Sequence, residues 1–243
     1  MIYVSLTSIP QRVKNINQSV ESLLKQTKKP DKIFINIPKK YRRFKENINN
    51  EQIPKFKNDA VEIIRCEDYG PGTKLLGSLD KLKADSLVIL VDDDHSYENY
   101  MIEKFYHFYS KAPENAYSFY VHPLKNFGVG QGADGFAINT NFLNGVKKFY
   151  DEIVKSNDDL FIHDDLWISF FIFYVKKVKI LSLQSHLRKN LDNNTSLIYK
   201  KHSKDFGLIE SYGDNINEAV RKRDQIAIES VKYMFDKISK IEF

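Results

Sequence analysis

The sequence predicts an α/β fold, a single domain with one mostly parallel central sheet flanked by helices. Short apolar runs rich in β-branched residues alternate with segments of helical periodicity, which is the order of a parallel sheet. The chain has 243 residues, enough for one large domain of this kind. Because 42% of the residues are hydrophobic and 28% are charged, the composition indicates a folded globular protein rather than a disordered one.

The first hundred residues supply a repeated strand and helix pattern. We expect strands at residues 2–6, 32–37, 60–65 and 86–91, and helices at residues 11–26 and from residue 75 onward. Residues 39–59 lack clear periodicity and are expected to form a loop with short helical turns. The crossovers between parallel strands should be right-handed.

The second half continues the alternation less regularly. We expect helices at residues 98–110 and 141–154 and near Asp164, and strands at residues 117–121, 136–138 and 179–183. Residues 126–135 hold four glycines without the strand-then-helix setting of a dinucleotide fingerprint, so we interpret them as a loop. Residues 1–190 are predicted to form the core, and residues 191–243 a polar loop and a C-terminal helix packed on that core.

Composition and charge exclude several classes of protein. The single cysteine, Cys66, excludes an internal disulfide and a cysteine-based zinc cluster, and it suits a reducing, cytoplasmic location. No apolar run approaches the roughly 20 residues that span a bilayer, and the start lacks signal-peptide features. Residues 1–65 are basic, with 14 Lys and Arg against 6 Asp and Glu. Aromatic residues and arginines are not interleaved there as they are in a nucleic-acid groove, so the sequence does not predict a nucleic-acid partner.

The most informative stretch is the apolar run at residues 86–91, which Asp92, Asp93 and Asp94 follow directly. Three adjacent carboxylates repel one another, and a bound divalent cation removes that repulsion. Magnesium and manganese prefer oxygen ligands, and the carboxyl ends of strands are where open α/β sheets bind ligands. The pattern therefore predicts a metal-assisted transferase site.

A second acidic segment begins the helix expected near residue 164. Asp164 and Asp165 lie between His163 and the only tryptophan, Trp167. Acidic residues stabilise the start of a helix, so capping is the simplest interpretation. Capping needs only one carboxylate, however, and the pair therefore remains a candidate for chemistry.

Three segments match, in order, the pattern of a known family. They are Ser5-Leu6-Thr7-Ser8-Ile9-Pro10-Gln11-Arg12, Glu67-Asp68-Tyr69-Gly70-Pro71-Gly72-Thr73-Lys74-Leu75 leading to Val91-Asp92-Asp93-Asp94, and His163-Asp164-Asp165-Leu166-Trp167-Ile168-Ser169. With these segments, the chain resembles nucleotide-sugar glycosyltransferases of the GT-A fold, especially the family-2-like group of bacteria and large DNA viruses. Viral capsid-glycan transferases such as the chlorovirus rhamnosyltransferase domain are the nearest relatives that the resemblance suggests. A viral origin would place the protein in the host cytoplasm.

The resemblance implies roles in binding the donor, a nucleoside-diphosphate sugar in which UDP is favoured over GDP. Asp92 would hydrogen-bond the ribose, Asp94 would ligate manganese or magnesium, and Asp93 would support either role. Asp68 would contact the base or ribose, Lys74 a phosphate, and Arg12 and Thr7 the nucleotide. His186 would add a third metal ligand, with His202 as the alternative.

The resemblance also implies inverting transfer to an acceptor hydroxyl of a glycan or glycoprotein. Such a reaction needs a base opposite the leaving group, and Asp165 would be that base, with Asp164 orienting a donor or acceptor group. The chain departs from typical members by having no membrane segment and a short C-terminal region, which leaves the acceptor open.

Two other functions fit part of the pattern. Haloacid-dehalogenase-type phosphatases also carry an Asp-x-Asp after a strand, but near the chain start, whereas here it follows the fourth expected strand. A non-catalytic nucleotide-sugar-binding module would need only the first acidic segment, so the second favours an enzyme. The sequence contains no Walker loop, so it does not predict a P-loop kinase.

Overall fold

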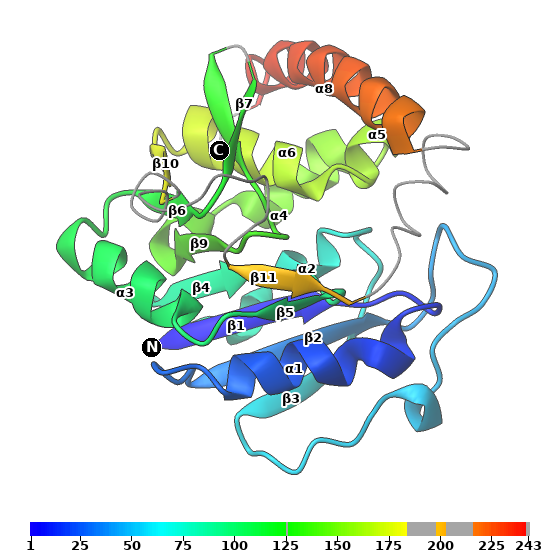
Figure 1. Cartoon of the computed structure of the whole chain (residues 1–243). Coiled ribbons are helices and arrows are strands. Elements are labelled where there is room, and N and C mark those ends of the chain that lie inside the picture. Colours follow the sequence, from blue (N-terminus) through cyan, green and yellow to red (C-terminus); the bar gives the residue numbers. More distant parts are fainter. Residues whose placement is uncertain (125, 184–197, 203–215, 242–243) are drawn as a thin grey trace.

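A mostly parallel sheet forms the centre of the molecule (Figure 1). The computed structural model describes residues 1–124, 126–183, 198–202 and 216–241. Within them, seven strands lie in the order β10-β6-β9-β4-β1-β2-β3. Their bounds are β1 (Ile2–Thr7), β2 (Lys32–Pro38), β3 (Val61–Cys66), β4 (Leu87–Leu90), β6 (Ala116–Ser118), β9 (Phe136–Asn139) and β10 (Ile180–Ser182). The pairs are parallel except those of β9, which is antiparallel to both β4 and β6. The predicted fold class is therefore confirmed.

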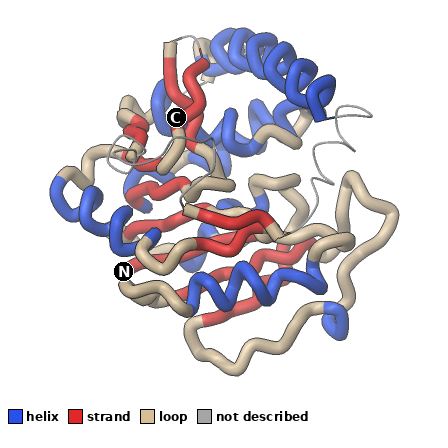
Figure 2. The backbone as a smooth tube through the Cα atoms, viewed as in Figure 1, coloured by secondary structure: helices blue, strands red, loops and turns tan. Residues whose placement is uncertain are grey.

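Helices cover both faces of this sheet (Figure 2). On one face lie α1 (Ile16–Leu24) and α3 (Met101–Lys111), and on the other α2 (Thr73–Leu76), α4 (Val146–Phe149), α5 (Asp158–Phe161) and α6 (Asp164–Phe170). Both α4 and α6 continue as single π-helical turns, at Tyr150–Val154 and Phe171–Val175. Alternate side chains of β1 serve the two faces, since Tyr3 joins one hydrophobic cluster and Val4 the other.

The C-terminal helix α8 (Ile216–Ile238) packs against α6 and the π-helical turn after it. Met234 is fully buried, and the ring of Phe235 lies 5.0 Å from that of Phe170 and 4.5 Å from that of Tyr174. In the part of the chain that the structure describes, no helix is long and apolar enough to cross a membrane.

Two segments that the sequence predicts as loops contain strands. The glycine-rich segment includes β8 (Phe127–Gly130), which pairs with β7 (Val121–Leu124) as an antiparallel hairpin. A side chain at Gly130 would meet the ring of Phe136 at 2.8 Å, so the glycine allows close packing rather than flexibility. The polar region after residue 188 includes β11 (Tyr199–Lys201), which pairs with β5 (His95–Tyr97).

Candidate functional site

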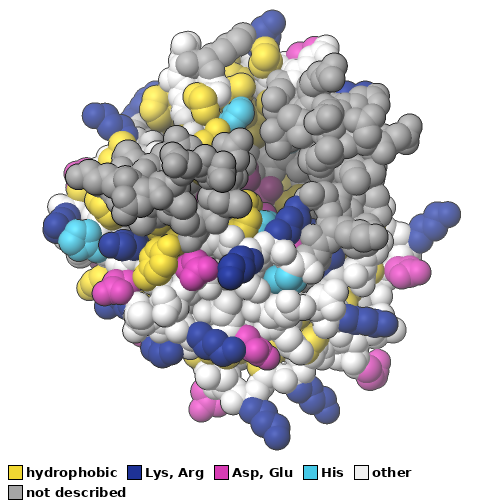
Figure 3. Space-filling view, in the orientation of Figure 1, with side chains coloured by type: hydrophobic (Ala, Val, Ile, Leu, Met, Phe, Trp, Pro, Cys, Tyr) yellow, Lys and Arg dark blue, Asp and Glu magenta, His cyan; other side chains and the backbone are white. Residues whose placement is uncertain are grey.

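A cavity of about 250 Å³ opens at the carboxyl ends of β1 and β4, where the sequence places its metal site. The space-filling view shows acidic, basic and histidine side chains gathered in a hollow at the centre of one face (Figure 3). Residues of both acidic segments line this cavity, namely Asp92, Asp93, Asp164 and Asp165. The two segments, far apart in sequence, therefore belong to one site.

Asp93 is anchored to the loop that follows β1. It is 2% exposed, accepts a hydrogen bond of 2.5 Å from the hydroxyl of Ser8, and lies 2.8 Å from the guanidinium of Arg12. Burial raises the pKa of Asp93, although Arg12 acts in the opposite direction. These contacts fix the position of the whole acidic segment relative to β1.

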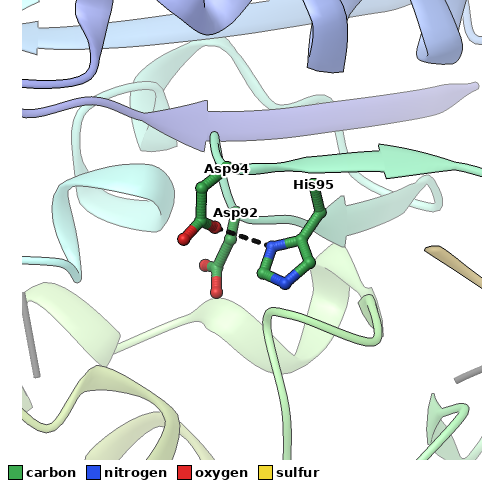
Figure 4. A group of neighbouring side chains, drawn as sticks. All are labelled: Asp92, Asp94 and His95. Atoms are coloured by element: carbon green, nitrogen blue, oxygen red, sulfur yellow. Dashed lines mark ion pairs between the residues drawn. The ribbon is translucent and has the colours of Figure 1, made fainter. Parts of the chain in front are cut away.

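Asp92, Asp94 and His95 form a group that could hold a metal ion (Figure 4). One ligand atom from each lies within 4.8 Å of the others, and His95 Nδ1 is 2.7 Å from Asp94 Oδ1. Burial would raise the pKa of Asp94, but the nearby His95 side chain and the Arg12 guanidinium together lower it, which favours the charged form that binds a cation. Two carboxylates and an imidazole are ligand types that can together hold a divalent cation.

Lys74 connects the two acidic segments. This residue of α2 is buried, and its Nζ lies 2.5 Å from Asp92 Oδ1 and 3.0 Å from Asp164 Oδ2. Burial would lower the pKa of Lys74, but the surrounding carboxylates raise it well above its ordinary value. Lys74 also lowers the pKa of Asp92 against the effect of burial.

Asp164 and Asp165 are the first residues of α6, as the sequence predicts, and they lie in different surroundings. Asp164 pairs with Lys74, whereas Asp165 Oδ1 accepts a hydrogen bond of 3.0 Å from the backbone N–H of Gly132. Burial, and then the Asp164 carboxylate, raise the pKa of Asp165 well above the ordinary aspartate value. Asp165 therefore holds a proton more readily than an ordinary aspartate does.

The remaining residues predicted for the nucleotide also line the cavity. Asp68 accepts hydrogen bonds from the backbone N–H groups of Arg42 and Gly70, at 2.6 and 2.9 Å. The hydroxyl of Thr7 donates to the carbonyl of Asn36 at 2.7 Å. Arg12 reaches Asp94 as well as Asp93, and its Nη1 lies 3.0 Å from Asp94 Oδ2.

Comparison with known proteins identifies the fold. No protein-family model matches the chain, and no curated protein matches it significantly by sequence. Among solved structures, the galactosyltransferase LgtC in complex with donor and acceptor sugar analogues matches with a TM-score of 0.51 and 8% identity, over 100% of this chain and 98% of its own. The apo glycosyltransferase GlyE of Streptococcus pneumoniae matches with a TM-score of 0.50 and 13% identity, over 98% of this chain and 63% of its own. The chain has the GT-A fold.

Staphylococcus aureus TarS in complex with UDP-GlcNAc also matches, with a TM-score of 0.49 and 12% identity, over 97% of this chain and 72% of its own.

His202, the alternative third metal ligand from the sequence, lies beside the group of Asp92, Asp94 and His95 but is not a member of it, and its role stays a prediction. The His202 Nε2 lies 3.0 Å from the hydroxyl of Ser19, and its backbone N–H donates to the Asp94 carbonyl at 2.9 Å. Burial lowers the pKa of His202. His186, the first choice from the sequence, lies outside the described residues.

Sequence reasoning missed three contributors. His95 directly follows the triple aspartate, and this adjacency was the signal that could have identified it as a candidate metal ligand. Gly132 and Lys201 carried no such signal, because they approach the site only through the fold. Lys201 Nζ lies 3.8 Å from Asp94 Oδ2, and Tyr199 packs its ring edge-on against His95 at 4.1 Å.

Proposed function

We propose that this protein is a glycosyltransferase that moves a sugar from a nucleoside-diphosphate sugar to an acceptor hydroxyl. The observation that carries the proposal is the cavity of a GT-A fold in which Asp92 and Asp165 face the same space. Asp92 belongs to a candidate metal group, whereas Asp165 has a raised pKa and a separate hydrogen-bond partner. A donor site and a base site side by side are what sugar transfer requires.

The donor occupies the part of the cavity next to β1 and β4 in this proposal. Asp68 and Thr7 contact the base or ribose, Asp92 contacts the ribose, and Arg12 faces the diphosphate. Asp92, Asp94 and His95 hold the cation, for which we favour manganese over magnesium because an imidazole is among the ligands. The cation supplies charge neutralisation to the leaving diphosphate.

Asp165 is the general base. Its carboxylate takes the proton of the acceptor hydroxyl while that oxygen forms a bond to the anomeric carbon of the sugar. The bond between that carbon and the phosphate oxygen breaks, and the nucleoside diphosphate leaves with the bonding electrons. Because attack comes from the face opposite the leaving group, the anomeric configuration is inverted. Asp164, held by Lys74, orients the reacting groups.

The acceptor contacts the apolar wall of the cavity, by which we mean the apolar residues of its lining that the β7–β8 hairpin, α6, the residue Ile162 before it and α8 supply. They are Leu124, Val129, Ile162, Leu166 and Ala227. Sugars present apolar C–H faces as well as hydroxyls, so this wall suits a glycan or glycoprotein acceptor. We also propose a cytoplasmic location, which suits the single cysteine. The resemblance of the three sequence segments alone supports the proposal of a role in viral capsid glycan synthesis.

Calorimetry with UDP-, GDP- and dTDP-sugars, each with and without Mn²⁺, tests the proposal. We expect one donor to bind in a metal-dependent manner, and its nucleoside diphosphate to be released on incubation. Absence of metal-dependent binding across the whole panel would refute the transferase. Hydrolysis of phosphate monoesters through a phosphorylated aspartate would instead favour the phosphatase alternative, and donor binding without turnover the non-catalytic module.

A further inference from the structure

Lys74 is a buried lysine that pairs with carboxylates of both acidic segments at once. Its side chain is 5% exposed, with Nζ 2.5 Å from Asp92 Oδ1 and 3.0 Å from Asp164 Oδ2. A buried ammonium group is stable only when it is well paired. Here one of its partners, Asp92, is also a member of the candidate metal group.

The surroundings hold this ammonium group in a defined place. The carbonyl of Lys74 accepts hydrogen bonds from the hydroxyl of Ser5, at 2.5 Å, and from the side-chain amide of Asn36, at 3.4 Å, which anchor its backbone to β1 and β2. Gly132 leaves the space that the ammonium group fills. A methyl group there would lie 2.5 Å from Lys74 Nζ and 3.0 Å from Asp92 Oδ1.

A divalent cation and this ammonium group compete for Asp92. Two positive charges that contact the same partly buried carboxylate repel each other, because the surroundings screen them less than bulk water does. Asp94 is paired in a similar way, with Arg12 Nη1 3.0 Å from its Oδ2. Arg12 and Lys74 each have a second partner outside the metal group, Asp93 for Arg12 and Asp164 for Lys74. Lys74 differs in that its second partner belongs to the other acidic segment.

We propose that Lys74 is a positioning residue that acts as an exchangeable counter-ion. In the metal-free site it holds Asp92 and Asp164 together, and when a divalent cation binds it releases Asp92 and keeps Asp164. Binding of a cation to Asp92, Asp94 and His95 is thereby coupled, through the side chain of Lys74, to the position of Asp164. The inference rests on the proposed function only for the role of Asp92 as a metal ligand.

Calorimetric titration with Mn²⁺ alone, without nucleotide, tests the exchange in wild type, Lys74→Met, Asp92→Asn and the double variant. Lys74→Met should lower the Kd for Mn²⁺ by roughly tenfold to a hundredfold, the factor expected when a charged group is freed from a hydrogen bond. In the Asp92→Asn background the same substitution should change the Kd little or not at all. Lys81→Met is the matched control, because Lys81 is half-exposed and pairs with Glu62 at the surface.

Two results would overturn the exchange. One is unchanged or weaker Mn²⁺ binding by folded Lys74→Met. The other is an equal gain in both backgrounds, which would reflect net charge alone. A merely structural lysine would weaken metal binding when it is replaced, so the sign of the change separates the two roles.

Gly132→Ala provides a second variant in case Lys74→Met does not fold. It changes no charge, and its methyl group would press harder on the ammonium group, at 2.5 Å, than on Asp92 Oδ1, at 3.0 Å, so we expect a smaller gain in Mn²⁺ affinity. A loss of affinity in this variant would count against the exchange. Because no nucleotide sugar is used, failure to find a donor would refute the transferase without affecting these titrations.

Discussion

Replacement of Asp165 by asparagine tests the proposed base directly. The substitution keeps the shape of the side chain, and the amide oxygen can still accept the hydrogen bond that Gly132 donates. What is lost is the ability to take a proton. General base catalysis contributes about 10²–10⁴ in rate, so the barrier should rise by about 2.7–5.4 kcal/mol, at about 1.36 kcal/mol per tenfold.

The assay is the initial rate of nucleoside diphosphate release from the donor that calorimetry identifies, with donor affinity measured separately. We expect the rate to fall by that factor while the affinity for donor changes little. Asp159→Asn, an exposed carboxylate on α5, is the matched control and should retain the wild-type rate. A rate within tenfold of wild type would show that Asp165 is not the base, and loss of donor binding would assign it to the donor site.

Asp165 should also affect stability in a way that depends on pH. Its pKa is raised in the folded state, so the folded protein holds this proton more tightly than the unfolded chain does. The stability that the protonated Asp165 side chain contributes is complete below the pKa of about 4 that it has in the unfolded chain. This stability is lost as the pH rises through the pKa of Asp165 in the folded protein. The Tm of Asp165→Asn should therefore increasingly exceed that of wild type as the pH rises. A Tm difference independent of pH would contradict this explanation.

Three further substitutions give defined outcomes. Met234→Ala removes a fully buried side chain of α8 and should lower the free energy of unfolding by about 2–5 kcal/mol in urea denaturation. Asp236→Ala changes an exposed residue of the same helix and should leave the free energy of unfolding unchanged. Equal free energies of unfolding for the two variants would mean that α8 adds little to the core. Gly70→Ala places a side chain at φ +62° against the carbonyl of Phe161 and should cost at least about 1–2 kcal/mol in the same assay, so an unchanged unfolding midpoint would disprove the strain. His95→Ala should weaken Mn²⁺ binding in calorimetry without nucleotide, and an unchanged Kd would remove His95 from the metal group.

The strands and the acidic segments were predictable because their signals are local. The apolar run before Asp92 has the length and composition of a buried strand, and β4 occupies it. The position of Asp164 at the start of a helix follows from its preference for that place. These patterns need no knowledge of distant residues.

The connections between the segments were not predictable, because they depend on tertiary packing. Nothing near Lys74 in the sequence indicates that its ammonium group lies between Asp92 and Asp164. The strand β8 was missed because its glycines suggest flexibility, whereas Gly130 is there to admit the ring of Phe136. When two distant segments pack closely together, neither segment carries a periodic sequence pattern that would predict the contact.

The pairing of β11 with β5 has a consequence for the order in which the site is completed. His95 and Asp94 are neighbours in sequence, yet Tyr199 covers the ring of His95, and the backbone N–H of His202 binds the carbonyl of Asp94. Because synthesis proceeds from the N-terminus, the acidic cluster leaves the ribosome long before its cover does. The carboxylates and the residues that pack over them are therefore far apart in the order of synthesis, so the site is complete only once β11 has paired with β5.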